Sequence, residues 1–163
     1  DMTAKYTVLG NTTLATASSS VTFSSIPGGH KDLVLVMDYK PSVNGDDCQV
    51  RYNSDTGSNY SYVVMSGDGS SSYSTSGTDT NVKMSGYSFS YPNTEFNLLT
   101  LQVADYSATD KHKSSLARVG RAAGGVTAYA HRWANTSAIT TLLVTNGSGS
   151  IAAGSTFRLL GVN

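Results

Sequence analysis

The stretch "LTLQV" at residues 99–103 alternates apolar side chains, Leu99, Leu101 and Val103, with polar ones. Successive side chains of a β-strand point to opposite faces, so this alternation predicts a strand with one face on a core and the other in water. The same period of two recurs along most of the chain. No stretch sustains the spacing of three and four residues that an amphipathic helix needs. The sequence therefore predicts an all-β protein.

Further segments of this kind follow one another at short intervals. They are residues 6–8, 21–23, 33–39, 48–52, 60–65, 82–89, 116–119, 126–133, 139–145 and 156–162. About ten short strands, joined by turn dipeptides such as Asn44-Gly45 and Asn146-Gly147, are typical of an antiparallel, jelly-roll-like β-sandwich. The length of 163 residues suits one domain, and we expect residues 1–163 to form a single sandwich.

The apolar phase of these segments predicts the core. Its expected members are Val21, Phe23, Leu33, Leu35, Met37, Leu99, Leu101, Val103, Leu143, Phe157 and Leu159. Residues 33–39 are apolar on both phases up to Asp38, which favours a strand in the middle of the sandwich. Residues 104–118 lack this order, so we expect a loop there and no long helix.

Composition and charge limit the functions that the chain can have. It holds 25 serines, 19 threonines, 16 glycines and a single glutamate, a balance that disfavours helices. Its 11 basic and 11 acidic residues cancel and are scattered, so no basic stripe is available to neutralise phosphates. The longest apolar run, residues 33–37, is too short to span a membrane. We expect neither a nucleic-acid partner nor membrane insertion.

No set of residues predicts catalysis or a cofactor. His30, His112 and His131 lie in three separate segments, and no G-x-S-x-G elbow marks a serine nucleophile. Cys48 follows two aspartates, which would raise the pKa of its thiol, so we expect a buried structural cysteine. We predict that the protein is not an enzyme and needs no cofactor.

The stretch "NSDTGSN" places oxygen-bearing side chains two and four residues apart, at Asn53, Asp55 and Asn59, much as a calcium loop does. The match fails in detail, because Gly57 is the fifth residue rather than the sixth and the twelfth is Val64 rather than a bidentate glutamate. No cysteine or histidine spacing suits zinc. A structural turn is the favoured interpretation, with calcium as the weaker alternative.

Residues 66–81 are rich in Ser, Gly, Thr and Asp, with Tyr73 as their lone aromatic residue, and we expect a surface loop there. Tyrosine presented among serine and glycine is also how adaptable recognition loops are built. Tyr60, Tyr62 and Tyr73 are therefore the candidate contact or glycan-binding residues. The alternation of Tyr60 and Tyr62 along one strand has a rival explanation as core or subunit interface.

Five segments, taken in order, carry a resemblance to a known group of proteins. They are "SSVTFSSIP" (19–27), "KDLVLVM" (31–37), "RYNSDTGSNYSY" (51–62), "WANTSAITTLLVT" (133–145) and "AAGSTFRLLGV" (152–162). Together they resemble structural proteins of tailed-phage virions, of the capsid-decoration, minor structural or tail-fibre kind. The resemblance implies a non-enzymatic β-sandwich on the virion, assembled in the host cytoplasm, and no catalytic residues.

A virion component of this kind is expected to associate with itself and with capsid or tail proteins. We expect a homo-oligomer, with a homotrimer preferred, because the exposed strand edges of a sandwich must be paired or protected. A capsid-decoration protein on the outer surface of the particle is the favoured function. The alternative is a tail-fibre tip or lectin-like domain that binds a host surface glycan.

Overall fold

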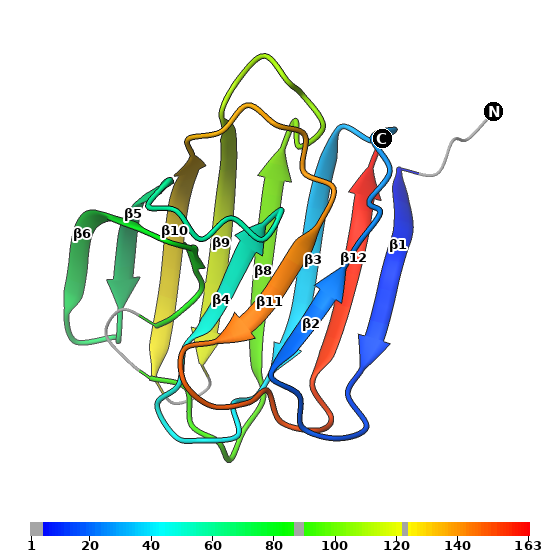
Figure 1. Cartoon of the computed structure of the whole chain (residues 1–163). Helices are drawn as coiled ribbons and strands as arrows, with labels where there is room; N and C mark the ends of the chain where they lie inside the picture. Colours follow the sequence, from blue (N-terminus) through cyan, green and yellow to red (C-terminus); the bar gives the residue numbers. More distant parts are fainter. Residues whose placement is uncertain (1–4, 87–89, 122–123) are drawn as a thin grey trace.

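The computed structural model describes residues 5–86, 90–121 and 124–163. Two antiparallel β-sheets pack face to face (Figure 1), and the described residues contain no helix. The predicted all-β, antiparallel sandwich is confirmed. Since no helix is present in these ranges, none is long and apolar enough to cross a membrane.

The large sheet has eight strands in the order β1-β12-β3-β8-β9-β10-β5-β6. Their bounds, in that order, are Tyr6–Thr13, Thr156–Val162, Asp32–Tyr39, Asn97–Ala104, Lys113–Arg121, Gly125–Trp133, Tyr60–Gly67 and Ser72–Asp79. The small sheet has four strands in the order β2-β11-β4-β7. These are Ser20–Phe23, Leu142–Asn146, Cys48–Tyr52 and Val82–Lys83.

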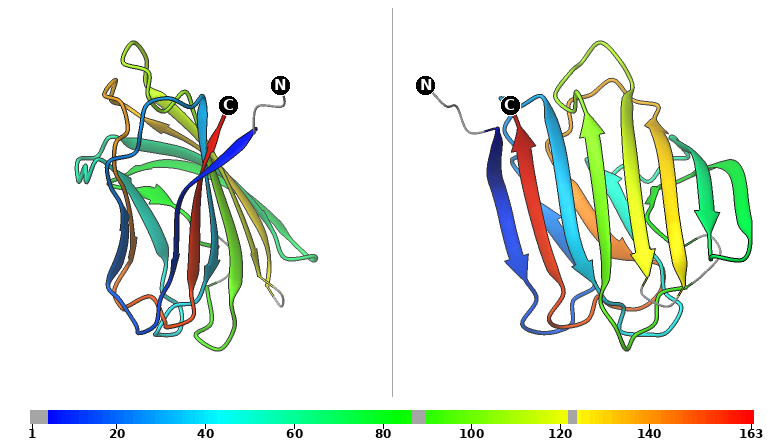
Figure 2. Two further views of the ribbon diagram at one scale, coloured as in Figure 1. Left: turned by 90° about the vertical axis from the view of Figure 1, so that its right-hand side faces the viewer. Right: turned by 180° about the vertical axis from the view of Figure 1, so that it is seen from behind.

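The core lies between the two sheets, which the edge-on view in Figure 2 (left) separates clearly. The residues predicted for it are buried, with one exception. Leu143 is only half-buried and its prediction is wrong, because Leu142 and Val144 occupy the inward phase of β11. The run "TLLV" is apolar on both phases, so periodicity alone could not decide which phase faces the core.

The surface loop predicted at residues 66–81 is wrong. Most of that range is strand: β5 continues to Gly67 and β6 pairs with it residue by residue from Ser72 to Asp79. Only the short turn between them is irregular, and the Asp68 carboxylate stabilises it by accepting hydrogen bonds from the backbone N–H groups of Ser70 and Ser71. Small hydroxyl side chains suit an edge strand whose backbone bonds hold it in place.

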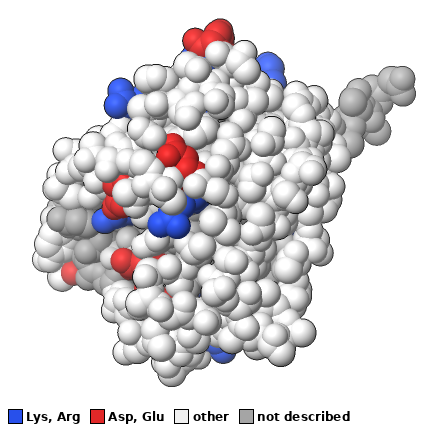
Figure 3. Space-filling model, in the orientation of Figure 1, with Lys and Arg blue, Asp and Glu red and all other residues white. Residues whose placement is uncertain are grey.

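Two other element boundaries differ from the prediction. The loop expected at residues 104–118 ends earlier, because β9 begins at Lys113. The strand expected at residues 82–89 is short, with β7 covering Val82–Lys83, and residues 87–89 lie outside the described residues. On the face of the small sheet, charged side chains are scattered rather than gathered into a basic stripe (Figure 3).

Candidate contact surface

The outer face of the large sheet is the side turned away from the small sheet. Alternate residues of each strand point there, among them Leu98 in β8, Leu116 in β9 and Val63 in β5. The view from behind in Figure 2 (right) shows no described segment crossing this face. In a single chain the outer face is therefore open to solvent.

Large apolar side chains gather on the outer face. The exposed ones are Tyr6, Val8, Val63, Met65, Leu98, Leu116 and Val126, each between 53% and 66% exposed. The half-buried Val34, Val36 and Leu160 add apolar area on the neighbouring strands β3 and β12. Single exposed apolar residues are normal, but a contiguous apolar patch marks a contact surface.

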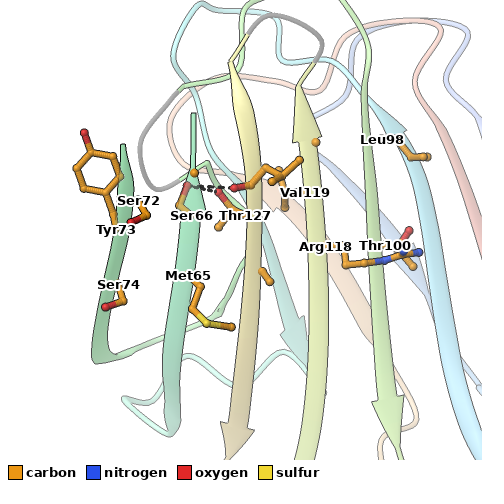
Figure 4. Close-up of a pocket in the computed structure, with 14 residues that line it drawn as sticks. Met65, Ser66, Ser72, Tyr73, Ser74, Leu98, Thr100, Arg118, Val119 and Thr127 are labelled. Carbon is orange, nitrogen blue, oxygen red and sulfur yellow. Dashed lines mark hydrogen bonds between the residues drawn. The ribbon is translucent and has the colours of Figure 1, made fainter. Parts of the chain in front are cut away.

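A hollow of about 810 Å³ indents the outer face over the strands from β8 to β6. Glycines 120 and 67 contribute backbone but no side chain to it, and a Cβ added at Gly120 would meet nothing within 4 Å. Leu98 and Met65 also line the hollow (Figure 4), as does Val126. Aliphatic walls over a backbone floor form a shape that can receive an apolar side chain.

The hollow offers little acid–base chemistry. Arg118 is the only charged side chain that lines it, and Figure 4 shows this side chain extended toward Thr100. The lining includes no Asp, Glu, His or Cys. A general acid and base pair, or a set of metal ligands, would need such groups. The hollow is thus suited to contact rather than to catalysis.

Charge divides the outer face into two halves. The strands β8, β9, β10, β5 and β6 contribute Arg118 and Arg132 and no acid, whereas β1, β12 and β3 contribute Asp32, Asp38 and Arg158. Among the described residues, neither Arg118 nor Arg132 forms an ion pair. One half is therefore purely cationic and the other carries the acids.

The inner face of the large sheet carries an aromatic cluster. The Trp133 ring lies 5.6 Å from that of Tyr52 and 6.3 Å from that of Tyr60, measured between ring centroids. The Trp133 indole N–H donates to Asp55 Oδ2 at 2.7 Å. Tyr60 is 1% exposed. The candidate Tyr60 is therefore a core residue that a ligand cannot reach without unfolding this region.

Tyr62 and Tyr73 lie on adjacent strands but do not form one platform. Tyr62 is opposite Gly77, whereas Tyr73 is opposite Ser66 at the other end of the hairpin. The Tyr62 ring covers Gly77 so closely that an added Cβ would lie 2.9 Å from the tyrosine hydroxyl oxygen. Tyr73 is 43% exposed, and its ring points away from Met65 and the hollow in Figure 4.

The "NSDTGSN" corner is held by internal hydrogen bonds. The Asp55 carboxylate accepts from the Gly57 backbone N–H, the Asn59 side-chain amide and the Trp133 indole. Burial opposes ionisation, but these bonds hold the pKa of Asp55 below its usual value. Asn53 Oδ1 accepts from backbone N–H groups after Ile139. The candidate calcium ligands are thus used by the turn, and no group of three or more His, Cys, Asp or Glu in the described ranges is placed to hold a metal.

A second carboxylate, that of Asp46, holds two loops together by hydrogen bonds. Asp46 accepts hydrogen bonds from the backbone N–H groups of Asp47, Ser148 and Gly149 and from the Asn146 side-chain amide. Burial opposes ionisation here too, yet the hydrogen bonds hold the pKa of Asp46 below its usual value. The residue joins the β3–β4 loop to the β11–β12 loop.

His131 and Cys48 are buried on the inner side. Burial raises the pKa of the Cys48 thiol, as do Asp47 and Asp46, so the predicted structural cysteine is confirmed. The His131 ring stacks on Tyr129 at 5.2 Å, and burial lowers its pKa to about 4. Neither ring nitrogen has a hydrogen-bond partner of ordinary geometry in the described residues, although the Lys83 backbone slightly favours the charged form.

The outer-face apolar residues are absent from the sequence-predicted contact set. Their signal in the sequence is an apolar side chain on the second phase of a strand, as at Leu98, Leu116 and Val126. The tyrosine-rich segment drew the prediction instead, because tyrosine among small polar residues is typical of recognition loops. The structure places most of that aromatic area inside the sandwich.

Comparison with known proteins gives architectural neighbours only. No family model and no curated protein matches the chain. Among solved structures, a galectin of Caenorhabditis elegans is 12% identical, with a TM-score of 0.40 and 98% of this chain and 96% of the galectin covered. An exo-inulinase from Aspergillus awamori is 11% identical, with a TM-score of 0.43, and the match covers 96% of this chain and 29% of the inulinase. Neither likeness bears on what this chain binds.

Proposed function

We propose that the protein is a non-enzymatic structural component of a tailed-phage virion, most simply a capsid-decoration protein that acts through protein–protein contacts. The observation that carries this function is the apolar outer face of the large sheet, with its seven exposed large side chains. A chain that worked alone would gain nothing from this patch and would risk aggregation. The assignment to a virion rests on the sequence resemblance.

The chemistry of the outer face supports a contact role. Its hollow is lined by aliphatic side chains, hydroxyls and backbone, with Arg118 as the only charge. An interface core of this kind is depleted in acids and lysine and keeps an occasional arginine. Covering the hollow would bury apolar surface, and each Å² buried contributes about 25 cal/mol of favourable free energy.

Co-sedimentation with purified tailed-phage capsids and tails tests this function. The wild type is expected to pellet with one of the two. Leu116→Arg should lose most of this binding, because it places a charge in the middle of the outer face. Val43→Arg is the matched control, since Val43 is 44% exposed but lies in the β3–β4 loop, away from that face.

Two results would contradict the proposal. A wild type that stays in the supernatant with both capsids and tails would remove the virion role. New reducing ends, released on incubation with host polysaccharide, would show an enzyme. We expect particle binding and no new reducing ends.

A glycan-binding tip is the second candidate, and one observation favours it. The hydroxyl-bearing Ser72, Ser74 and Thr100 line the hollow beside its aliphatic walls, and the exposed Tyr73 ring stands next to it on the edge strand. Hydroxyls can exchange hydrogen bonds with a neutral sugar, and weak single sites would gain affinity through several copies. An oligomeric form should then give signal on a glycan array that Tyr73→Ala reduces, without a change in melting temperature. A dark array would exclude this candidate.

A further inference from the structure

We infer that the outer face of the large sheet packs against the same face of a second copy of this chain, forming a two-fold, face-to-face dimer. This inference rests on the proposed contact role and names a second copy as the partner that covers the outer face, so Leu116→Arg would weaken particle binding through loss of the dimer. The dimer takes the place of the trimer expected from the sequence. Three features of the outer face carry it: its area, the fit of its relief, and the arrangement of its charges.

The area is sufficient for a stable dimer. Eight strands about 4.8 Å apart and mostly about eight residues long span roughly 1,000 Å² of sheet face. A typical specific interface buries about 800 Å² on each partner. The outer face therefore matches a protein partner of its own size, whereas a small ligand would fill the hollow and leave most of the apolar area exposed.

The strand register shows how two copies would fit. A two-fold axis parallel to the strands, between β8 and β9 at the centre of the sheet, lays β8 of one copy over β9 of the other and β3 over β10. Leu98 and Gly120 are paired neighbours on β8 and β9. The axis therefore places Leu98 of each copy over Gly120 of the other, where no side chain fills the space. Because the axis is two-fold, this contact between Leu98 and Gly120 forms twice in the dimer.

The same axis places apolar residues on apolar residues beyond the centre. Leu160 of β12 comes to lie over Val63 of β5, since both stand in the row that contains Leu116. Val36 likewise comes over Ala128. Twisted sheets pack with their strands about 30° apart, so the register holds best near the axis and loosens toward the edges.

One pair of charges is complementary in this arrangement. Asp32 of β3 lies one residue beyond the pair of Leu33 and Val103, which puts it level with Ala104, Ser114 and Arg132 at mirrored positions about the axis. Each Asp32 therefore faces Arg132 of the second copy, and this happens twice. In the single chain the Asp32 carboxylate accepts hydrogen bonds from the Gln102 side-chain amide and the Asp105 backbone N–H. In the single chain Arg132 forms no ion pair with the described residues. Opposed charges of this kind fix orientation and suppress wrong partners.

Sedimentation velocity of the purified chain, without particles, tests the inference. The wild type should sediment as a dimer that dissociates on dilution. Leu116→Arg should raise the dissociation constant at least tenfold, because Leu116 lies beside the axis and the new arginine would be covered by Gln102 of the second copy, in a row that contains no acid. Val43→Arg should dimerise as the wild type does. Arg132→Glu should weaken the dimer, and adding Asp32→Lys should restore it.

Melting temperatures of all variants separate misfolding from lost contact. Each substituted side chain except that of Asp32 is exposed, so the monomers should melt within a few degrees of the wild type. A monomeric wild type, a trimer, or a dimer unaffected by Leu116→Arg would overturn the inference. A monomer that still binds particles leaves the proposed function standing. If the wild type dimerises but binds no particle, the proposed function is wrong and the face-to-face dimer stands.

Discussion

The two faces of the large sheet are built from the same strands but are finished differently. The inner face carries aromatic and branched side chains that are almost fully buried, with polar tips such as the Trp133 indole bonded to fixed acceptors. The outer face carries aliphatic side chains that are more than half exposed, such as Leu116 and Val126. The small sheet covers the inner face within the chain, and the outer face is open to solvent in the single chain.

This difference shows that alternation alone does not identify the solvent side of a sheet. A polar second phase is expected where water covers the second face. In β8, β9 and β10 the second phase mixes polar residues with Leu98, Leu116, Val126 and several alanines. An apolar residue on the second phase can face the interior of a fold or of an assembly, and we propose the second explanation for these strands.

The largest expected effect is on the inner face. Trp133→Ala removes a fully buried ring from its contacts with Tyr52 and Tyr60 and leaves Asp55 without its indole donor. We expect a loss of about 3–5 kcal/mol in the free energy of unfolding, measured by urea denaturation. A loss below 1 kcal/mol would mean that the cluster is not the core of that end of the sandwich.

Asp46→Ala should come next. It removes the acceptor shared by the N–H groups of Ser148 and Gly149 and should cost about 2–4 kcal/mol. The folded pKa of Asp46 lies below its unfolded value, so this contribution is present above the unfolded value of 3.8 and is lost as the pH falls below it. Urea denaturation of both proteins at neutral and acid pH measures it, and a difference that grew in acid would contradict the assignment.

His131 gives the inner face a pH-dependent contribution to stability. Its folded pKa of about 4 lies below the usual histidine value of 6.5, so the unfolded chain binds the extra proton and stability falls as the pH drops from 6.5 toward 4. At pH 5 the loss should be about 2 kcal/mol relative to neutral pH. His131→Phe should reduce that loss in a urea titration, and an unchanged pH profile would show that the imidazole is hydrated.

The smallest expected effect concerns the outer face of the single chain. Leu116→Ala, measured on dilute monomer, should change the free energy of unfolding by less than about 0.5 kcal/mol, since Leu116 is 60% exposed. The same substitution at the buried Leu101, on the neighbouring strand, should cost about 2–5 kcal/mol. Equal losses at the two positions would remove the distinction between the faces.

Much of the fold follows from the sequence, because apolar residues at every second position indicate a strand whose successive side chains point to opposite faces. The inward phases of β3, β8 and β12 are predicted correctly, as Leu35, Leu101 and Phe157 show. The phase fails at Leu143, where two leucines stand side by side. Composition misleads at β6, because serine and glycine suggest a loop while the strand is held by backbone bonds to β5.

The candidate site was harder to predict than the fold. Tyr60 stands out in the sequence as an aromatic residue in a polar segment, yet its place in the core depends on Trp133, which is distant in the chain. The outer face gathers Leu98, Leu116 and Val63 on one side of a sheet whose strand order is not sequential. Single-strand patterns do not reveal which apolar residues a sheet brings together.

Thiol labelling across a range of protein concentrations tests the central claim, that the outer face is covered by another protein surface, most directly. The native Cys48 is buried and its raised pKa keeps it unreactive, so Leu116→Cys and Val43→Cys each introduce one readable thiol. At high concentration the Leu116→Cys thiol should react much more slowly than the Val43→Cys thiol, and the two rates should converge on dilution. Equal rates at every concentration, for the chain alone and with bound particles, would show that the outer face stays open and would contradict the claim.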